Sequence, residues 1–140
     1  MLLTIFVVLQ FKDVESFKPF PTTVHVSITN NFTNSLQVDV HCKDNHDDFG
    51  NKTLKYKEVY SFSFKTTFLL PNKLYFCSVS WIHGFKYFVV YDQKRDDDDC
   101  EKECPWAINE YGPCKEKPGN VIECYQYNFY SFSFFHFTSM

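Results

Sequence analysis

The sequence has 140 residues and a formal net charge of −3, which leaves room for one domain and gives too little positive charge for a nucleic-acid surface. Seventeen Phe, nine Tyr and two Trp supply much of its apolar content. Because aromatic side chains favour the half-buried surface of a β-sheet, the composition indicates a strand-rich domain and excludes a nucleic-acid partner.

The start of the chain is apolar up to Leu9 and turns polar at Gln10. This stretch is too short to span a bilayer but fits the apolar core of a secretory signal peptide. Val14 and Ser16 provide a small-residue cleavage pattern, although a positively charged start is missing. We predict a signal peptide at residues 1–16, a secreted extracellular product, and no direct membrane insertion after the leader is removed. The alternatives are a buried N-terminal strand and a start codon placed too late.

Alternation of apolar and polar residues predicts short strands along the rest of the chain. In the first of them, Val24, Val26 and Ile28 face one side, whereas His25 and Ser27 face the other. The predicted strands are residues 23–29, 36–42, 60–64, 73–81, 85–91, about 106–111, and 121–127. A hairpin is the simplest link between the first two strands.

The intervening segments are polar, and none shows a helical period. Residues 41–57 read as a long loop and residues 92–103 as a charged loop. We therefore predict an all-β fold, a small disulfide-stabilised β-sandwich of about seven to eight short antiparallel strands at residues 17–127.

Residues 128–140 form an aromatic tail without a clear place in this fold. Its segment Tyr130 to Phe134 repeats Tyr60 to Phe64 letter for letter. An uncharged aromatic run is an aggregation hazard when it is exposed. We expect the tail to be an extension of the gene model or a loosely attached strand outside the core.

An even number of cysteines in a short chain with a secretory start is typical of an exported, disulfide-stapled domain. Cys114 and Cys124 bracket a turn and are expected to form a local clasp, whereas the pairing of the other four stays open. The disulfide candidates are Cys42, Cys77, Cys100, Cys104, Cys114 and Cys124.

Two sequons for N-linked glycosylation fall in predicted loops, where a glycan can be accommodated. They are Asn31-Phe32-Thr33 and Asn51-Lys52-Thr53. We predict Asn31 and Asn51 as N-glycosylation sites.

The sequence carries no motif for a metal, a cofactor or a catalytic site. Cys100 and Cys104 lack a second close pair with matching histidines, and the EF-hand spacing is absent from the acidic segments. There is no nucleophile elbow, no phosphate-binding glycine loop and no His-Glu-x-x-His motif. We expect no enzyme, no bound metal and no cofactor.

Two functions remain open for a secreted β-sandwich of this kind. A defence or cell-wall module would bind carbohydrate through exposed aromatic residues such as Tyr87 or Trp106. A secreted hydrolase would need a cleft with convergent titratable groups. A secreted ribonuclease, for example, would need a histidine pair with a lysine. His25 and His41 lie on predicted outward faces and could approach each other, but nothing else in the sequence marks them as such a pair.

Short sequence pieces follow one another in a distinctive order through about residues 24–127. They are Val26-Ser27-Ile28-Thr29-Asn30, Leu36 through His41-Cys42-Lys43, Asp47-Asp48-Phe49-Gly50, Tyr60-Ser61-Phe62-Ser63-Phe64, Phe76-Cys77, Tyr87 to Asp92, Cys100-x-x-x-Cys104-x-Trp106, Gly112-Pro113-Cys114 and Cys124-Tyr125. Together they resemble the plant self-incompatibility S-protein family, in which the position of Phe49 is usually Leu. The tail after Tyr127 lies outside the resemblance.

The resemblance implies a small secreted β-sandwich that acts as a signalling ligand. In the founding members, proteins secreted by the pistil are recognised by a pollen membrane receptor, and recognition leads to pollen rejection. The implied partner is therefore a cell-surface receptor protein, and we expect the chain itself to be a monomer. A part in pollen rejection does not follow from the resemblance.

A rigid sandwich that presents its loops to a receptor is the mechanism that we expect. The receptor-facing candidates come from the two charged segments and are Asp44, Asp47, Asp48, Lys52, Asp96, Asp97, Asp98 and Asp99. Alanine at residues 96–99 is expected to abolish receptor binding and to leave folding intact. The alternative is that both segments are merely solvated turns.

Overall fold

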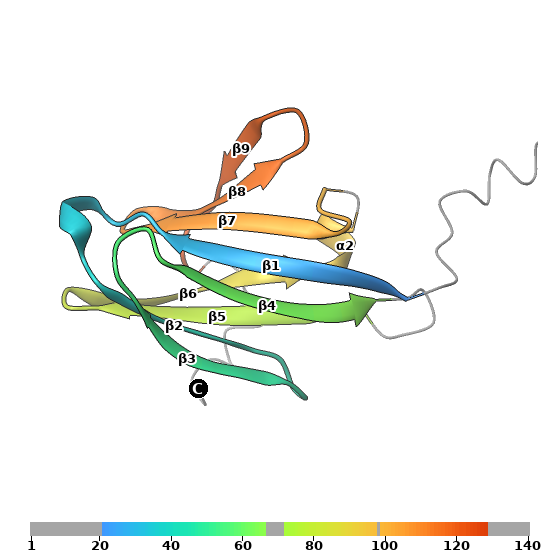
Figure 1. Ribbon diagram of the computed structural model, residues 1–140, viewed down its shortest axis with the longest axis horizontal. Coiled ribbons are helices and arrows are strands. Elements are labelled where there is room, and N and C mark those ends of the chain that lie inside the picture. Colours follow the sequence, from blue (N-terminus) through green and yellow to red (C-terminus); the bar gives the residue numbers. More distant parts are fainter. Residues whose placement is uncertain (1–20, 67–71, 98, 129–140) are drawn as a thin grey trace, which may run out of the picture.

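A computed structural model describes residues 21–66, 72–97 and 99–128, which form two β-sheets packed face to face (Figure 1). The all-β, disulfide-stabilised sandwich is confirmed. Sheet A has the strand order β4-β1-β7-β8-β9, and sheet B has the order β3-β2-β5-β6. The predicted signal peptide at residues 1–16 and the tail from residue 129 onward lie outside the described residues.

The strands of sheet A are β1 (Thr22–Asn30), β4 (Val59–Thr66), β7 (Glu103–Asn109), β8 (Gly112–Lys117) and β9 (Val121–Cys124). The first strand pairs antiparallel with β4 and parallel with β7. The parallel pair departs from the antiparallel expectation. The chain builds all of sheet B between these two strands and then re-enters sheet A from the end at which β1 begins, so β1 and β7 run in the same direction.

The strands of sheet B are β2 (Val38–Lys43), β3 (Asp48–Leu54), β5 (Leu74–Trp81) and β6 (Gly84–Asp92), and all their pairs are antiparallel. The hairpin expected between the first two strands does not form, because β1 and β2 belong to different sheets. The 3-10 turn η1 (Thr33–Ser35) lies in the segment that connects them. The fully buried side chain of Asn30 fixes this crossing, since its amide donates to the carbonyl oxygens of Leu36 (2.8 Å) and Leu54 (3.0 Å).

The prediction of a loop over residues 41–57 is wrong, because β3 lies within it. This strand is at the edge of sheet B, and almost all its side chains are exposed. Only Leu54, at its end, is buried. An edge strand that buries so little lacks the alternation on which the prediction relied, and polar side chains on edges limit unwanted strand pairing.

The core between the sheets is mainly aromatic. The inward face of β4 supplies Tyr60, Phe62 and Phe64, which are 3%, 8% and 8% exposed. The ring of Phe64 lies 4.5 Å from Tyr75 and 4.7 Å from Tyr91, measured between centroids. Such contacts at 4.5–7 Å add to the stabilisation that burial itself provides.

Three disulfides join the six cysteines, and none of them is free. Cys42 and Cys77 are opposite each other on β2 and β5, and both are fully buried. The other two bridges are local and link Cys100 to Cys104 and Cys114 to Cys124. The last of these joins β8 to β9, as expected for a clasp.

Candidate functional site

The connections between strands lie at two opposite ends of the sandwich (Figure 1). One end carries the β2–β3 turn, residues 44–47, and the β6–β7 segment, residues 93–102, and we call it the acidic end. The opposite end, which we call the loop end, carries residues 31–37, 55–58, 82–83 and 110–111. The fold therefore brings the two charged segments singled out in the sequence to the same end.

The carboxylates of the β2–β3 turn are engaged by the turn itself. Asp44 Oδ1 accepts a hydrogen bond from the backbone N–H of Asp47 at 2.5 Å. Asp48 Oδ1 accepts one from the N–H of Gly50 at 2.9 Å and lies 2.6 Å from His41 Nε2. The bond from Gly50, followed by the contact with His41, lowers the pKa of Asp48. These hydrogen bonds order the turn, and the two carboxylates that accept them are less available to a binding partner.

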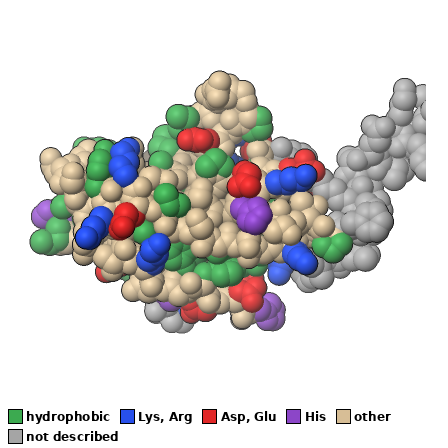
Figure 2. Space-filling view, in the orientation of Figure 1, with side chains coloured by type: hydrophobic (Ala, Val, Ile, Leu, Met, Phe, Trp, Pro, Cys, Tyr) green, Lys and Arg blue, Asp and Glu red, His purple; other side chains and the backbone are tan. Residues whose placement is uncertain are grey.

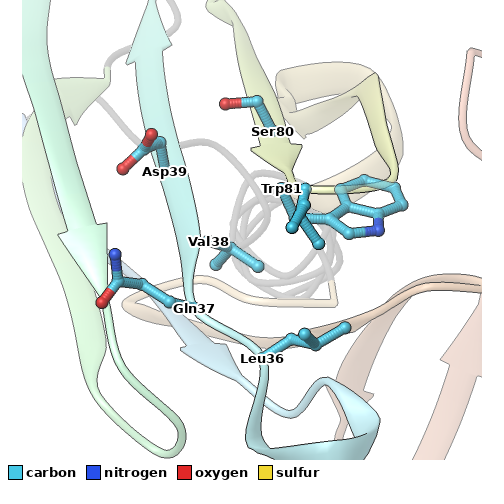
Figure 3. Close-up of a pocket in the computed structure, with 7 residues that line it drawn as sticks. Leu36, Gln37, Val38, Asp39, Ser80 and Trp81 are labelled. Carbon is cyan, nitrogen blue, oxygen red and sulfur yellow. The ribbon is translucent and has the colours of Figure 1, made fainter.

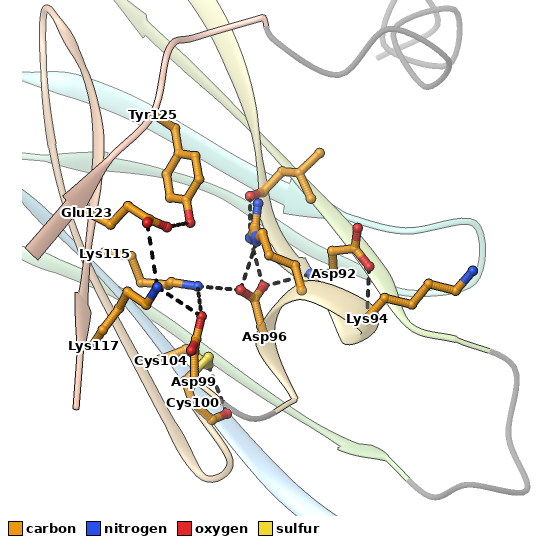
Figure 4. A network of polar contacts seen from close by, with 12 residues as sticks. Asp92, Lys94, Asp96, Asp99, Cys100, Cys104, Lys115, Lys117, Glu123 and Tyr125 are labelled. Atoms are coloured by element: carbon orange, nitrogen blue, oxygen red, sulfur yellow. Dashed lines mark hydrogen bonds and ion pairs between the residues drawn. A yellow bond between two sulfur atoms is a disulfide. The ribbon is translucent and has the colours of Figure 1, made fainter.

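Asp96 is not a solvated loop residue, and the prediction that it faces a receptor is wrong. It ends the one-turn helix α2 (Gln93–Asp96) and is fully buried (Figure 4). Its carboxylate accepts two bonds from Arg95, at 2.8 Å from Nε and 2.7 Å from Nη2, and a bond from the N–H of Asp92 at 2.9 Å. The fourth contact is an ion pair with Lys115 Nζ.

Burial by itself would raise the pKa of Asp96, but the hydrogen bonds and charge of Arg95, followed by the bond from Lys115, lower it overall. Lys115 lies on β8 and is itself fully buried. Its ammonium group is 5.9 Å from the centroid of the Trp106 ring. This pair ties α2 of the acidic end to β8 of sheet A, so alanine at Asp96 is expected to destabilise the fold.

Asp99, in the rest of the acidic run, is held by two lysines. Asp99 Oδ2 lies 3.4 Å from Lys117 Nζ and 3.5 Å from Lys115 Nζ. Asp97 is half-buried, and Asp98 lies outside the described residues. Figure 2 shows acidic, basic and apolar side chains interspersed over one face of the molecule, without a large patch of one charge.

Lys52 and both sequon asparagines are exposed. Lys52 and Asn51 lie on β3 instead of in the expected loop, and Lys52 Nζ donates to the carbonyl oxygen of Val59 at 3.2 Å. Asn31 Oδ1 accepts a hydrogen bond from Lys57 Nζ at 2.7 Å. Exposure is what a glycan requires, and glycosylation at Asn31 and Asn51 stays a prediction.

The loop end exposes large apolar side chains on three separate turns. Tyr111 on the β7–β8 turn is 82% exposed, Ile82 on the β5–β6 turn 80%, and Tyr56 on the β3–β4 turn 42%. These exposed side chains do not pack into the core, so core packing does not explain why the three positions are apolar. Exposed apolar residues gathered in one region are typical of interaction surfaces.

A shallow hollow of about 370 Å³ lies beside this group (Figure 3). Its apolar part is formed by Leu36, Val38 and Trp81, and the indole of Trp81 packs edge-on against Phe32 at 4.9 Å. The other lining residues are Gln37, Asp39, Ser80 and Ile82. The hollow is a concave, partly apolar surface that includes Ile82 of the β5–β6 turn.

Three residues named for the rival functions are placed where they do not support those functions. Trp106 is 2% exposed and belongs to the core, so it is not available to carbohydrate. His25 lies on β1 of sheet A, whereas His41 lies on β2 of sheet B and contacts Asp48. The expectation that these two histidines could approach each other is wrong, because they point outward from opposite sheets.

Within residues 21–66, 72–97 and 99–128, no group of three or more His, Cys, Asp or Glu side chains is arranged to hold a metal ion. In the same part of the chain, no helix is long and apolar enough to cross a membrane.

Sequence reasoning missed Lys115 and the exposed side chains of the loop end. Lys115 alternates with Pro113 along β8, and both are buried, but a lone lysine gives no sign of burial without its partner Asp96. For Ile82 and Tyr111 there was a signal, because each stands beside a Gly-containing turn where a polar residue is usual.

Comparison with known proteins gives consistent matches. The family model for plant self-incompatibility protein S1 matches residues 25–129. The curated S-protein homolog 2 of Arabidopsis thaliana is 40% identical over 116 residues, which is 78% of this chain and 71% of that protein. S-protein homolog 5 of the same plant is 35% identical over 107 residues, covering 76% of this chain and 80% of its own.

Solved structures with this fold include the following match. It is a structure of self-incompatibility protein homologues, described as a widespread family of small, highly stable, secreted proteins from plants. The match has a TM-score of 0.56 at 13% identity and covers 76% of this chain and 95% of the other.

Proposed function

The chain belongs to the plant self-incompatibility protein S1 family, and from this premise we propose that it is a secreted extracellular ligand recognised by a cell-surface receptor protein. Whether the ligand acts in the pistil or in another tissue depends on where it is expressed.

Secretion is supported by the cysteines and by the relatives. All six cysteines are paired, and disulfides form and persist in oxidising compartments outside the cytosol. Related solved proteins are described as secreted and highly stable. A stapled sandwich of this kind keeps its loops in place outside the cell, where chaperones are scarce.

The observation that carries the ligand proposal is the set of exposed apolar side chains at the loop end. Tyr56, Ile82 and Tyr111 project from three different turns on a rigid frame. Tyrosine is enriched in the energetically important centres of protein interfaces, and apolar neighbours exclude water around it. We therefore assign the receptor-facing surface to this end.

The acidic end fits the receptor role less well. Asp96 is buried, Asp48 contacts His41, and Asp99 pairs with Lys117 within the chain. A partner that bound these carboxylates would have to replace contacts already made. We therefore assign the receptor-facing surface to the loop end, instead of to the charged segments that the sequence suggested.

The first prediction concerns the receptor affinity of a triple variant, Tyr56→Ser, Ile82→Ser and Tyr111→Ser. Saturable binding of the labelled chain to plant plasma-membrane vesicles is expected to weaken by about 100-fold or more, since two interface hot spots at roughly 2 kcal/mol each exceed that factor. The stability of the chain is expected to change little, because Ile82 and Tyr111 are largely exposed and Tyr56 is 42% exposed.

The matched control is Val121→Ser with Ile122→Ser, which removes apolar side chains that are 52% and 65% exposed on β9. This variant is expected to bind like the unmodified chain. Equal affinity of the triple variant and the unmodified chain, or an equal loss in the control, would refute the assignment of the loop end.

A further inference from the structure

The sequon Asn31-Phe32-Thr33 stands at the loop end, beside two of the turns that carry exposed tyrosines. Asn31 follows β1, whereas Tyr56 belongs to the β3–β4 turn and Tyr111 to the β7–β8 turn (Figure 1). We propose that an N-linked glycan on Asn31 covers Tyr56 and Tyr111, so that the chain without this glycan is the form that binds the receptor. The proposal rests on the ligand function proposed above and adds a means of regulating it.

Contacts on one side bring Asn31 to the turn of Tyr56. Asn31 Oδ1 accepts a hydrogen bond from Lys57 Nζ at 2.7 Å. The same ammonium group lies 4.9 Å from the centroid of the Tyr56 ring. Because Lys57 bridges the side-chain amide and the aromatic ring, the first sugar of a glycan on Asn31 would stand beside Tyr56.

Contacts on the other side bring the sequon to the turn of Tyr111. The N–H of Asn31 donates to the carbonyl oxygen of Ile108, near the end of β7, at 2.8 Å. The N–H of Thr33 donates to Oε2 of Glu110 at 3.1 Å, and Glu110 directly precedes Tyr111. The sequon therefore contacts the β7–β8 turn as well as the β3–β4 turn.

The sequon is held in a fixed orientation. Its middle residue, Phe32, is fully buried and packs edge-on against the ring of Trp81 at 4.9 Å. The N–H of Phe32 donates to Asn30 Oδ1 at 2.9 Å. With Phe32 anchored in the core, Asn31 and Thr33 on either side of it are both exposed. A glycan joined to Asn31 would therefore leave the sandwich from the loop end.

The chemistry of the modification sets the direction of the effect. A bond forms between Asn31 Nδ2 and C1 of the first sugar of a lipid-linked oligosaccharide, while the lipid diphosphate leaves and the amide loses one proton to solvent. The attached glycan is bulky and hydrated. Tyrosines contribute strongly to an interface where their neighbours exclude water. A hydrated glycan between the two tyrosines and a receptor would prevent that exclusion, so we expect it to weaken binding.

The second sequon provides a matched comparison. Asn51 lies in the middle of β3, opposite His41, at the edge of sheet B. About 10 Å of extended strand, at roughly 3.3 Å per residue, separates it from Leu54, the last residue before the β3–β4 turn. A glycan on Asn51 would project from the edge of sheet B, away from the loop end, and we expect receptor binding to tolerate it.

The test uses the whole chain secreted by plant cells and compares it with Thr33→Ala, Thr33→Ser and Asn51→Gln. Thr33→Ala destroys the first sequon and leaves Asn31 in place, whereas Thr33→Ser keeps that sequon and Asn51→Gln removes only the second. Peptide mass spectrometry is expected to find a glycan on Asn31 in the unmodified chain and in Thr33→Ser, but not in Thr33→Ala. Absence of a glycan from Asn31 of the unmodified chain would overturn the proposal.

Receptor affinity is measured as saturable binding to plant plasma-membrane vesicles. Thr33→Ala is expected to bind at least about 10-fold more tightly than the unmodified chain, because both tyrosines are uncovered. Thr33→Ser and Asn51→Gln are expected to bind like the unmodified chain. Equal or weaker binding by Thr33→Ala, or an equal gain in Asn51→Gln, would overturn the proposal.

A readout that needs no receptor separates failure of this proposal from failure of the ligand function. In the free chains, hydroxyl-radical labelling of Tyr56 and Tyr111 is expected to be higher in Thr33→Ala than in the unmodified chain, whereas labelling of the exposed Ile122 on β9 is expected to be equal. Equal labelling of the two tyrosines would overturn the proposal, whatever the vesicles bind. Covered tyrosines together with no saturable binding by any form would contradict the ligand function, and the regulation with it.

Discussion

Replacement of Asp96 by alanine is expected to lower the free energy of unfolding by about 3–5 kcal/mol, because it removes one partner of a buried ion pair. The change would leave Lys115, which is fully buried, without its anion. Arg95 would lose both of its bonds to the carboxylate, and the N–H of Asp92 would lose its acceptor. Urea denaturation with the disulfides intact measures the difference.

Two further variants separate the ion pair from a general effect of lost charge. Glu116→Ala removes an exposed carboxylate next to Lys115 and is expected to change stability by less than about 0.5 kcal/mol. Asp96→Ala combined with Lys115→Met is expected to recover part of the loss, because no unpaired charge is left buried. An Asp96 variant no less stable than the Glu116 variant would contradict a structural role for the pair.

The same residue sets a direction for the pH dependence. The folded state lowers the pKa of Asp96 below its usual value near 3.8. A lowered folded pKa gives stability that is present above the usual pKa and is lost as the pH falls through the folded pKa. The unmodified chain should therefore lose stability in acid below about pH 4, and the alanine variant should lose less over that range.

Removal of the Cys42–Cys77 bridge is expected to cost about 4 kcal/mol, the entropy that a loop of this length regains in the unfolded chain. The two cysteines are 35 residues apart. They lie opposite each other on the central strands of sheet B and are fully buried, so replacement by alanine also removes core packing. Thermal or urea unfolding of Cys42→Ala with Cys77→Ala tests the value.

The local clasp provides the comparison. Cys114 and Cys124 are 10 residues apart, and Cys124 is exposed. Their double replacement by alanine is expected to cost roughly 1 kcal/mol less than loss of the core bridge, because the closed loop is shorter. A clasp variant that is less stable than the core-bridge variant would show that loop length and burial do not determine which disulfide contributes more to the free energy of unfolding.

The sequence predicts the strands that bury one face and misses the one that does not. Val24, Val26 and Ile28 reveal β1 because their alternation reflects burial against sheet B. No such pattern exists in β3, where Leu54 is the single buried residue. The local sequence does not indicate strand direction either, since the parallel pairing of β1 with β7 depends on the path of the chain between them.

The candidate site shows the same limit. A run of four aspartates suggests solvent, but burial of Asp96 depends on Arg95 beside it and on Lys115, which is 19 residues away in sequence and comes from another strand. The exposure of Tyr56 and Tyr111 likewise follows from the positions of turns in the sandwich. Local patterns predict elements, whereas contacts between distant residues decide which charges are neutralised and which aromatic side chains are presented.

The location of the ligand surface can be measured directly by hydroxyl-radical footprinting of the chain bound to plant plasma-membrane vesicles. Tyr56, Ile82 and Tyr111 are exposed in the free chain, so they are accessible to the radical. We predict that binding protects these three side chains at the loop end and leaves the acidic end, including residues 44–47, unchanged. Protection confined to the acidic end, with the loop end as reactive as in the free chain, would contradict the account.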